Sequence, residues 1–412
     1  MTAYFDQLEI RTPDEREAQL FSDLPARIAH AKSKSPYFAE LLAAVEPDAV
    51  NSRRALAALP VTRKSQLVER QRQTLPFGGL TTVACGELAR IFASPGPVYE
   101  PEGRGSDYWR AARALFAAGF RKGDVIHNSF SYHLTPAGSF FETGAHALGC
   151  AVVPGGVGQT DLQLRTIADV RPNGYVGTPS FLRILLDKAA ETGLSIASIS
   201  KALVSAEPFP PAVRDAFKKA GITGYQCYGT ADLGLIAYES EALEGMILDE
   251  QVIVEIVHPG TGDPVEDGTV GEVLVTTMTR EYPLIRFSTG DLSAFLSGTS
   301  PCGRTNRRIK GWMGRADQAT KVRGMFVHPM QIQELIRRHN EIGAARVIVS
   351  RDVHGNDEMV LNIEAAAPIG DLMRISETLH AVTRLRGKVV QVPTGSLPKD
   401  GIMVADARKH DY

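Results

Sequence analysis

Between residues 105 and 230, short apolar runs alternate with longer amphipathic segments, and this alternation restricts the fold more than any other feature. The predicted strands are the apolar runs at 125–130, 150–154, 175–177, 202–205 and 225–228. The predicted helices are the segments at 110–119, 162–170, 180–191 and 211–220. Strands alternating with helices form parallel sheets whose loops gather at one edge. The chain is therefore predicted to be α/β, with its site at the strand ends.

The segments on either side have a different character. Residues 14–45 carry apolar side chains at helical spacing, and Pro36 interrupts that helix. After residue 245, strands are predicted around a turn rich in Gly, Asp and Pro. The last 95 or so residues read as a small α+β unit. We expect a large domain of mixed sheets over 1–316, with a helical start over 1–70, and a small mobile domain over 317–412.

The charge balance and the cysteines limit the class of partner. The chain has 45 Lys+Arg against 47 Asp+Glu, a net charge of −2, which excludes nucleic acid or an anionic membrane as its main partner. The four cysteines (Cys85, Cys150, Cys227 and Cys302) are widely separated, so no metal site is predicted. Scattered thiols favour a reducing cytoplasm. No signal peptide and no membrane span are predicted from the sequence.

Several motifs follow one another in a characteristic order. They are 35-SPYFAELL-42, 59-LPVTRKSQL-67, 75-LPFGGL-80, 119-GFRKGDV-125, 225-YQCYGTADLG-234, 288-STGDL-292, 314-GRAD-317 and 396-SLPKDG-401. In this order they resemble the phenylacetate–CoA ligase family of the adenylate-forming superfamily. The resemblance implies two steps: ATP and a carboxylate give an acyl-adenylate and pyrophosphate, and CoA then displaces AMP. It also implies a C-terminal domain that moves between the steps.

The resemblance assigns roles to residues that would bind the nucleotide. Asp291 matches the carboxylate that accepts hydrogen bonds from both ribose hydroxyls, although an Asp in a turn more often caps its own backbone. Tyr228 matches the aromatic residue that stacks on adenine, and Asp232 the acid that supports magnesium. Asp232 is shorter than the usual Glu, and a Tyr at a strand end can equally be a core residue. Both interpretations of Tyr228 stay open.

Near the domain boundary the resemblance assigns a hinge and a CoA tunnel. Asp317 occupies the hinge position, and Arg315 precedes it with a guanidinium suited to phosphate or ribose oxygens. Arg323 and Gly324 match the loop that lines the CoA tunnel, where a thin pantetheine arm passes close to a residue that lacks Cβ. The alternative for both arginines is a solvated surface charge.

Two departures from the family pattern concern the same half-reaction. The phosphate loop, which reads Ser-Ser-Gly-Thr-Thr-Gly-Lys-Pro in the family, is 93-ASPGPVYEP-101 here, so that Glu100 stands in place of a lysine. In the tail, Ile402 stands where the lysine that assists adenylation is expected, and Lys399 lies three residues earlier. Losing a positioned charge of this kind costs about 10²–10³ in rate. The pattern predicts weakened activation by ATP.

The region matching the family's acyl pocket supplies further candidates. His127 and His133 are candidate catalytic bases, although such histidines are more often satisfied wall residues. The candidate pocket residues are Tyr132, Phe140, Phe141, Gly155 and Gly156. The basic run 304–310 is either a site for the CoA phosphates or a solvated turn.

These observations lead to a ranked set of functions. The first hypothesis is an acyltransferase that moves an aryl-type acyl group from a preformed CoA thioester to a thiol or amine, for example on an acyl carrier protein. The alternative is an ATP-dependent aryl carboxylate–CoA ligase, with Lys399 as the compensating lysine and ATP, AMP and Mg²⁺ as ligands. A non-catalytic sensor of acyl-CoA or nucleotide is the third. The family resemblance adds a homodimer as an expected assembly.

Overall fold

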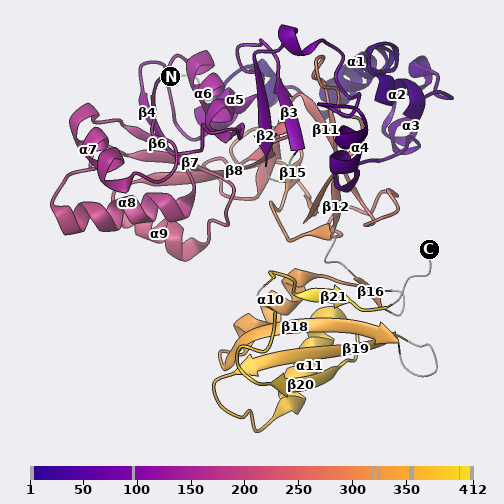
Figure 1. Ribbon diagram of the computed structural model, residues 1–412, viewed down its shortest axis with the longest axis vertical. Helices are drawn as coiled ribbons and strands as arrows, with labels where there is room; N and C mark the ends of the chain where they lie inside the picture. Colours follow the sequence, from indigo (N-terminus) through magenta and orange to yellow (C-terminus); the bar gives the residue numbers. More distant parts are fainter. Residues whose placement is uncertain are drawn as a thin grey trace. The chain divides into compact units, whose positions relative to one another are not determined.

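The computed structural model describes residues 4–94, 98–316, 320–322, 325–351, 357–398 and 400–408 (Figure 1). The chain forms two compact units. The first consists of Met1–Thr289 and Ser293–Trp312, and the second of Gly290–Leu292 and Met313–Tyr412. A short piece of the chain around Asp291 therefore belongs with the C-terminal residues, although it precedes the boundary drawn from the sequence.

The first unit is built on a sheet of nine strands in the order β14-β15-β10-β9-β8-β7-β6-β4-β5. Its strands are β4 (Val125–Asn128), β5 (Ala151–Pro154), β6 (Gly174–Gly177), β7 (Lys201–Val204), β8 (Thr223–Thr230), β9 (Gly234–Tyr238), β10 (Met246–Leu248), β14 (Phe295–Leu296) and β15 (Arg308–Ile309). Strands β4 to β8 are parallel. From β8 to β14 neighbouring strands are antiparallel. The predicted α/β class is confirmed.

Helices cover both faces of the parallel strands (Figure 1). The helices are α5 (Ala111–Ala117), α6 (Ala137–Leu148), α7 (Thr160–Val170), α8 (Pro179–Thr192) and α9 (Pro211–Lys219). Successive strand residues point to opposite faces. Val176 and Leu203 accordingly pack with α5 and α6, whereas Tyr175 and Ala202 pack with α7, α8 and α9.

The strand order reverses beside β4. The chain runs from β4 outward to β5 and then returns past β4 to β6, so β4 lies between them. In open α/β sheets, ligands bind outside the carboxyl ends of the strands at such a reversal. The residues after β4 and β6 are therefore candidates for the site.

A second sheet and a hairpin complete the first unit. The sheet has the order β1-β13-β12-β11, and β2 pairs with β3 alone. The strands are β1 (Thr62–Arg63), β2 (Arg90–Ser94), β3 (Val98–Glu102), β11 (Val252–Val257), β12 (Gly271–Thr277) and β13 (Phe287–Ser293). Strand β13 contains the piece Gly290–Leu292 that belongs to the second unit.

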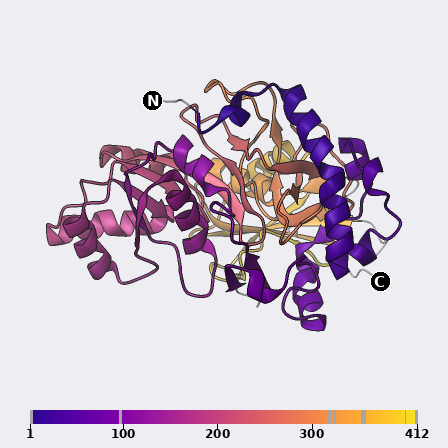
Figure 2. The same cartoon turned by 90° about the horizontal axis from the view of Figure 1, so that it is seen from above.

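The N-terminal helices are α1 (Pro13–Lys34), α2 (Pro36–Leu41), α3 (Arg53–Ala57) and α4 (Leu67–Gln73). Helix α1, indigo in Figure 2, begins with a capping box between Thr12 and Glu15. The predicted helical run over 14–45 is interrupted at Pro36 as expected, because Pro36 cannot continue α1 and instead opens α2.

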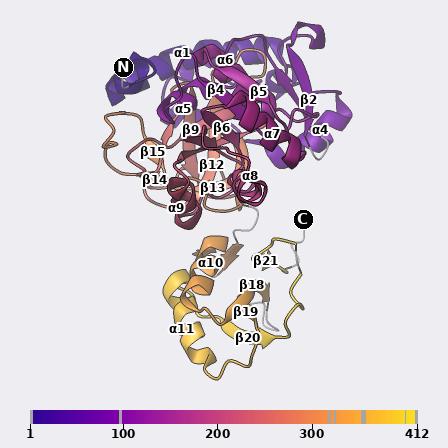
Figure 3. The same ribbon diagram turned by 90° about the vertical axis from the view of Figure 1, so that its left-hand side faces the viewer.

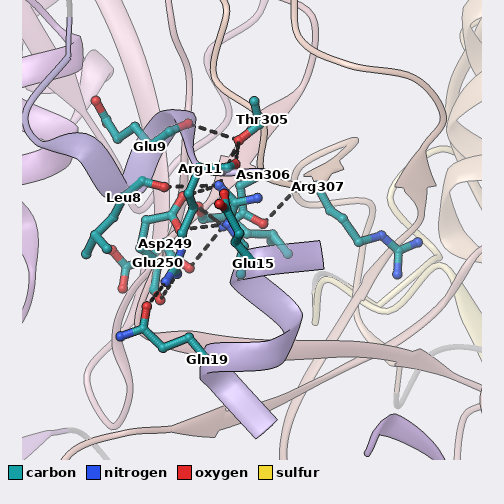
Figure 4. A network of polar contacts seen from close by, with 12 residues as sticks. Leu8, Glu9, Arg11, Glu15, Gln19, Asp249, Glu250, Thr305, Asn306 and Arg307 are labelled. Atoms are coloured by element: carbon teal, nitrogen blue, oxygen red, sulfur yellow. Dashed lines mark hydrogen bonds and ion pairs between the residues drawn. The ribbon is translucent and has the colours of Figure 1, made fainter. Parts of the chain in front are cut away.

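The segment before α1 is held by a network of ion pairs and hydrogen bonds (Figure 4). Buried Glu250 receives hydrogen bonds from Arg11 Nη2 at 3.0 Å and from Arg16 Nε at 2.8 Å. The Thr305 N–H donates to the Glu9 carbonyl oxygen at 3.0 Å. Residues 9–16 are therefore anchored to the rest of the first unit.

The second unit carries the sheet β20-β19-β18-β21 with two helices on one face (Figure 3). Its elements are β16 (Thr320–Val322), β17 (Met325–Val327), α10 (Pro329–Arg338), β18 (Ile342–Arg351), β19 (Asp357–Ala365), α11 (Leu372–Thr383), β20 (Lys388–Val392) and β21 (Val404–Asp406). Apolar side chains of both helices and of the sheet form its core. No described helix in either unit combines the length and apolarity that a membrane crossing requires.

Candidate active site at the strand ends

The motif around Tyr228 lies at the end of β8, where the sheet changes from parallel to antiparallel pairing. A Cβ at Gly229 would lie 2.6 Å from the Gly234 carbonyl oxygen and 3.2 Å from the Phe140 ring, so only glycine fits there. Tyr228 is 8% exposed and belongs to the hydrophobic core that includes Leu233. The stacking of its ring on adenine stays a prediction.

Asp232 follows this motif and is bound to a lysine from a distant segment. Its carboxylate is buried, and Oδ2 lies 2.5 Å from Nζ of Lys64. Lys64 starts a short 3₁₀ helix directly after β1. The other oxygen, Oδ1, is buried and has no hydrogen-bond partner among the described residues. Asp232 therefore combines a satisfied ion pair with one unused acceptor.

Glu100 lies beside this ion pair on β3. Its Oε2 accepts hydrogen bonds from the Ser94 N–H at 3.3 Å and from the Ser94 hydroxyl at 3.0 Å. Burial and, to a smaller extent, the nearby Asp232 carboxylate raise the pKa of Glu100 to about 7, although Ser94 and Lys64 partly oppose the change. Lys64, Ser94, Glu100 and Asp232 thus form one group, which we call the strand-end cluster.

The strand-end cluster fits a magnesium ion that arrives with a nucleotide. The described residues contain no group of three His, Cys, Asp or Glu side chains suited to a metal ion. Mg²⁺ commonly binds through one or two carboxylates, with substrate phosphates and water as its other ligands. The unused Oδ1 of Asp232 meets that requirement, so Asp232 is the residue that would hold the ion.

A second polar group lies at the strand reversal beside β4. Gln163 on α7 donates to the carbonyl oxygens of Gly156 and Gly158 at 2.9 and 2.6 Å, which turns its Oε1 toward His127 Nε2 at 2.7 Å. His127 Nε2 must therefore carry the hydrogen. A Cβ at Gly155 would lie 2.8 Å from the same nitrogen. His127 and the glycine loop, separate in the sequence, are held together here.

The environment of His127 favours the neutral form of its ring. The side chain is fully buried, and burial lowers its pKa, which the bond to Gln163 partly offsets. Its Nδ1 has no partner within the described part of the chain. The contacts of His127 are those of a residue that fixes the glycine loop, and its action as a base stays a prediction.

The candidate aromatic residues fall into two environments. Phe140 and Phe141 are buried with ring centroids 4.5 Å apart, and Phe140 reaches Gly229 of the β8 motif. Tyr132 and His133 lie in the loop after β4 and are exposed. The Tyr132 hydroxyl accepts a hydrogen bond from Asn128 Nδ2 at 2.8 Å. Phe140 thus connects the predicted acyl pocket to the nucleotide motif.

In the second unit, Asp291 is paired with Arg315. Nη1 of Arg315 lies 3.1 Å from Oδ1 of Asp291, and the two backbones form an antiparallel bridge. Gly290 is in the left-handed region, and a Cβ there would lie 2.6 Å from the guanidinium. Asp317, Arg323, Gly324 and Lys399 lie outside the described residues, so their predicted roles are untested. Ile402 is described and partly exposed.

Several charges of the basic run 304–310 bind other side chains of the first unit, and a role toward the CoA phosphates stays a prediction. Arg304 is buried and bound to Glu9 at 3.1 Å, and Arg308 is buried with Nη1 3.1 Å from Glu244. Arg307 lies over the Phe295 ring. Three of these charges are therefore engaged within the first unit.

Comparison with known proteins agrees with this geometry. The AMP-binding enzyme family matches residues 110–280. The structure of an open conformation of 2-hydroxyisobutyryl-CoA ligase, in complex with 2-HIB-AMP and CoA, superposes with a TM-score of 0.86 at 25% identity, covering 98% of this chain and 95% of that chain. The fold and the strand-end motifs are those of an adenylate-forming enzyme.

More similar in sequence are curated phenylacetate–CoA ligases. The Thermus thermophilus protein is 31% identical over 93% of this chain and 89% of its own length. The Escherichia coli protein is 33% identical over 80% of this chain and 78% of its own length. This chain belongs to the phenylacetate–CoA ligase family.

The first functional hypothesis from the sequence is wrong. The relatives that span most of the chain are named as carboxylate–CoA ligases, not as acyltransferases that use a preformed thioester. That hypothesis rested on the absence of a lysine in only two short motifs, the phosphate loop and the C-terminal tail. The structure places Lys64, from a third segment, beside Asp232 and Glu100, so a cation is present near the altered loop.

Two residues of the site were not singled out from the sequence. Lys64 lies within the quoted motif 59–67, yet nothing in that motif shows which acid it meets. Gln163 had no signal at all, because its contact with His127 depends on the position of α7 relative to β4. The contacts of Lys64 with Asp232 and of Gln163 with His127 are long-range in sequence, which is why local patterns do not reveal them.

Proposed function

We propose that this protein is an AMP-forming carboxylate–CoA ligase that acts on an aryl-type acid. ATP and the acid give an acyl-adenylate and pyrophosphate, and the CoA thiol then displaces AMP to give the thioester. The relatives named phenylacetate–CoA ligase support both the reaction and the class of acid. The solved structure of 2-hydroxyisobutyryl-CoA ligase contains an acyl-adenylate, 2-HIB-AMP, together with CoA, which supports the same order of adenylate formation followed by thioester formation.

The observation that carries the proposal is the state of Asp232. One of its oxygens binds a lysine, and the other is a buried acceptor without a partner among the described residues. A buried acceptor left unused costs free energy, so such atoms commonly mark the place of a ligand. An Mg²⁺-bound triphosphate supplies that ligand, and a reaction starting from a preformed thioester does not need it.

The class of acid is inferred from the family and from the aromatic cluster beside the motif. Phe130 and Phe141 are stacked with ring centroids 4.9 Å apart, and Phe140 extends this cluster to Gly229. Aromatic surface of this kind favours an aryl group over a short hydroxy acid. Phenylacetate and its ring-substituted analogues are therefore the first acids to test.

The test is the formation of AMP and of a CoA thioester from ATP, CoA and a panel of acids. The panel contains phenylacetate, hydroxyphenylacetates, benzoates and 2-hydroxyisobutyrate, and products are quantified by chromatography and mass spectrometry. We expect equal amounts of AMP and thioester with at least one aryl acid, and none when ATP is omitted. Failure of every acid, or thioester formation without ATP, would overturn the proposal.

A further inference from the structure

Strand β3 carries Glu100, a carboxylate, at the position where the family's phosphate loop has a lysine. Glu100 is 1% exposed, and its carboxylate accepts the hydrogen bonds that the Ser94 N–H and hydroxyl can donate. Backbone N–H groups and hydroxyls in such loops are the donors that hold phosphate oxygens. Glu100 therefore occupies donors that an anionic ligand would use.

A triphosphate cannot be accommodated beside two carboxylates without a compensating cation. At a separation of about 4 Å, the interaction energy of two unit charges in a partly buried setting is several times larger than in bulk water. Glu100 and Asp232 both repel phosphate oxygens, and each raises the cost of placing them there. In addition to the Mg²⁺ that arrives with the nucleotide, a cationic side chain must come from another segment, because position 100 does not supply one.

Lys64 satisfies the requirements for that cation. Its Nζ is 2.5 Å from Asp232 Oδ2, and its side chain is 36% exposed while the Asp232 side chain is fully buried. An ammonium group has three donors, so the bond to Asp232 leaves capacity for further acceptors. Lys64 is thus anchored at one side and accessible at the other.

We propose that Lys64 is the cation that faces the ATP phosphates in this protein and replaces the one that position 100 lacks, with Asp232 as the residue that positions it. The inference rests on the proposed function only in naming ATP as the nucleotide. A merely structural ion pair between Lys64 and Asp232 is the alternative, and it predicts no preference among nucleotides.

The experiment compares equilibrium binding of AMP and of the non-hydrolysable analogue AMPPCP with Mg²⁺ at pH 8.0, by isothermal titration calorimetry. We expect Lys64→Met to weaken AMPPCP about 10-fold or more and AMP less than about 3-fold, because charge-assisted bonds to the outer phosphates are lost. Lys64→Arg keeps most of the affinity. Arg63→Met is the matched control, since Arg63 bonds to the Gly260 carbonyl oxygen, and it should bind both nucleotides as the parent does.

A compensating substitution separates phosphate binding from folding. Glu100→Lys restores a cation at the loop, so it should tighten AMPPCP on its own and recover most of the affinity lost in Lys64→Met. Equal changes for AMP and AMPPCP, or no recovery by Glu100→Lys, would contradict the proposal. If Lys64→Met does not fold, Lys64→Arg and Glu100→Lys test the proposal instead. Lys64→Arg should keep most of the AMPPCP affinity, and an unchanged AMPPCP affinity in Glu100→Lys would refute the proposal.

The binding assay contains neither acid nor CoA. Its result therefore stands whether or not ligase activity is found, and a failure of the proposed function would appear separately as absence of AMP formation.

Discussion

Asp291 and Arg315 form an ion pair of 3.1 Å between Oδ1 and Nη1, and their backbones pair as an isolated antiparallel bridge. The carboxylate that the family resemblance assigns to the ribose hydroxyls is therefore oriented by a guanidinium. This pairing is formed within one unit, so it does not depend on the placement of the other.

Removing the charge of Asp291 should impair nucleotide use specifically. Asp291→Asn keeps the size of the side chain but replaces one acceptor oxygen by an NH2 group, so one charge-assisted bond to a hydroxyl, worth about 1.5–3 kcal/mol, is lost. We expect kcat/KM for ATP to fall about 10- to 100-fold, with little change in KM for the acid. Glu334→Gln on the exposed part of α10 is the control. Equal effects on ATP and acid would contradict the assigned role.

The buried His127 should make stability depend on pH. Its pKa in the folded protein is lowered, whereas the unfolded chain titrates near 6.5, so around and below pH 6.5 the unfolded state binds more of the proton than the folded state does. The free energy of unfolding should therefore fall between pH 7.5 and pH 5.5, by at most about 1.4 kcal/mol from this residue.

Urea unfolding of the parent and of His127→Gln at both pH values measures this contribution. The parent should lose more stability on acidification than the variant does, because the other histidines are common to both. Parallel pH profiles for the two proteins would show that His127 takes up a proton in the folded state.

Gly155 should not tolerate a side chain. A Cβ there would lie 2.8 Å from both Gln163 Oε1 and His127 Nε2. Gly155→Ala is expected to lower the free energy of unfolding by about 1–3 kcal/mol, as overpacking commonly does. Gly86→Ala is the matched control, because a Cβ at Gly86 meets nothing within 4 Å and its φ is not positive. Comparable losses in the two variants would refute the contact.

The N-terminal segment should contribute to the stability of the first unit through Glu9. Its fully buried carboxylate accepts from Arg304 Nε at 3.1 Å and from the Tyr238 hydroxyl at 2.8 Å. Glu9→Ala leaves a buried guanidinium without this partner, at a cost of about 3–5 kcal/mol.

The control for Glu9→Ala is a variant that breaks a half-exposed Glu–Arg ion pair. Glu17→Ala removes the partner of Arg53, and because that pair is accessible to water its loss should cost no more than about 1 kcal/mol. Thermal or urea unfolding measures both. A small effect of Glu9→Ala would mean that the segment before α1 is not needed for the fold.

Strong local periodicity explains which elements were predictable. Helices α8 and α9 begin and end within one residue of the bounds expected from the sequence, because each carries a regular apolar pattern between clear breaks. The hairpin of β2 and β3 was missed, because its Ala-Ser-Pro-Gly-Pro run has the composition of a loop. The two strands stabilise each other by antiparallel pairing, which a local pattern does not show. Strand β9 was missed because all of its residues are buried and no alternation marks it.

The residues of the site were predictable only where they lie together in one contiguous motif. The motifs around Tyr228 and Asp291 are contiguous, so their positions could be read from the sequence. The contact of Lys64 with Asp232 joins residues 168 positions apart, and that of His127 with Gln163 joins residues 36 apart. Such contacts follow from the tertiary fold, and overlooking Lys64 led to the wrong conclusion about ATP.

The measurement that tests the central claim most directly is pyrophosphate release in the absence of CoA. The protein is mixed with ATP, Mg²⁺ and phenylacetate or another active acid, and the acyl-adenylate is sought by mass spectrometry. Our account predicts release of about one equivalent of pyrophosphate per protein, followed by thioester and AMP when CoA is added. Thioester formation that never passes through an acyl-adenylate, or no release with any acid, would contradict it.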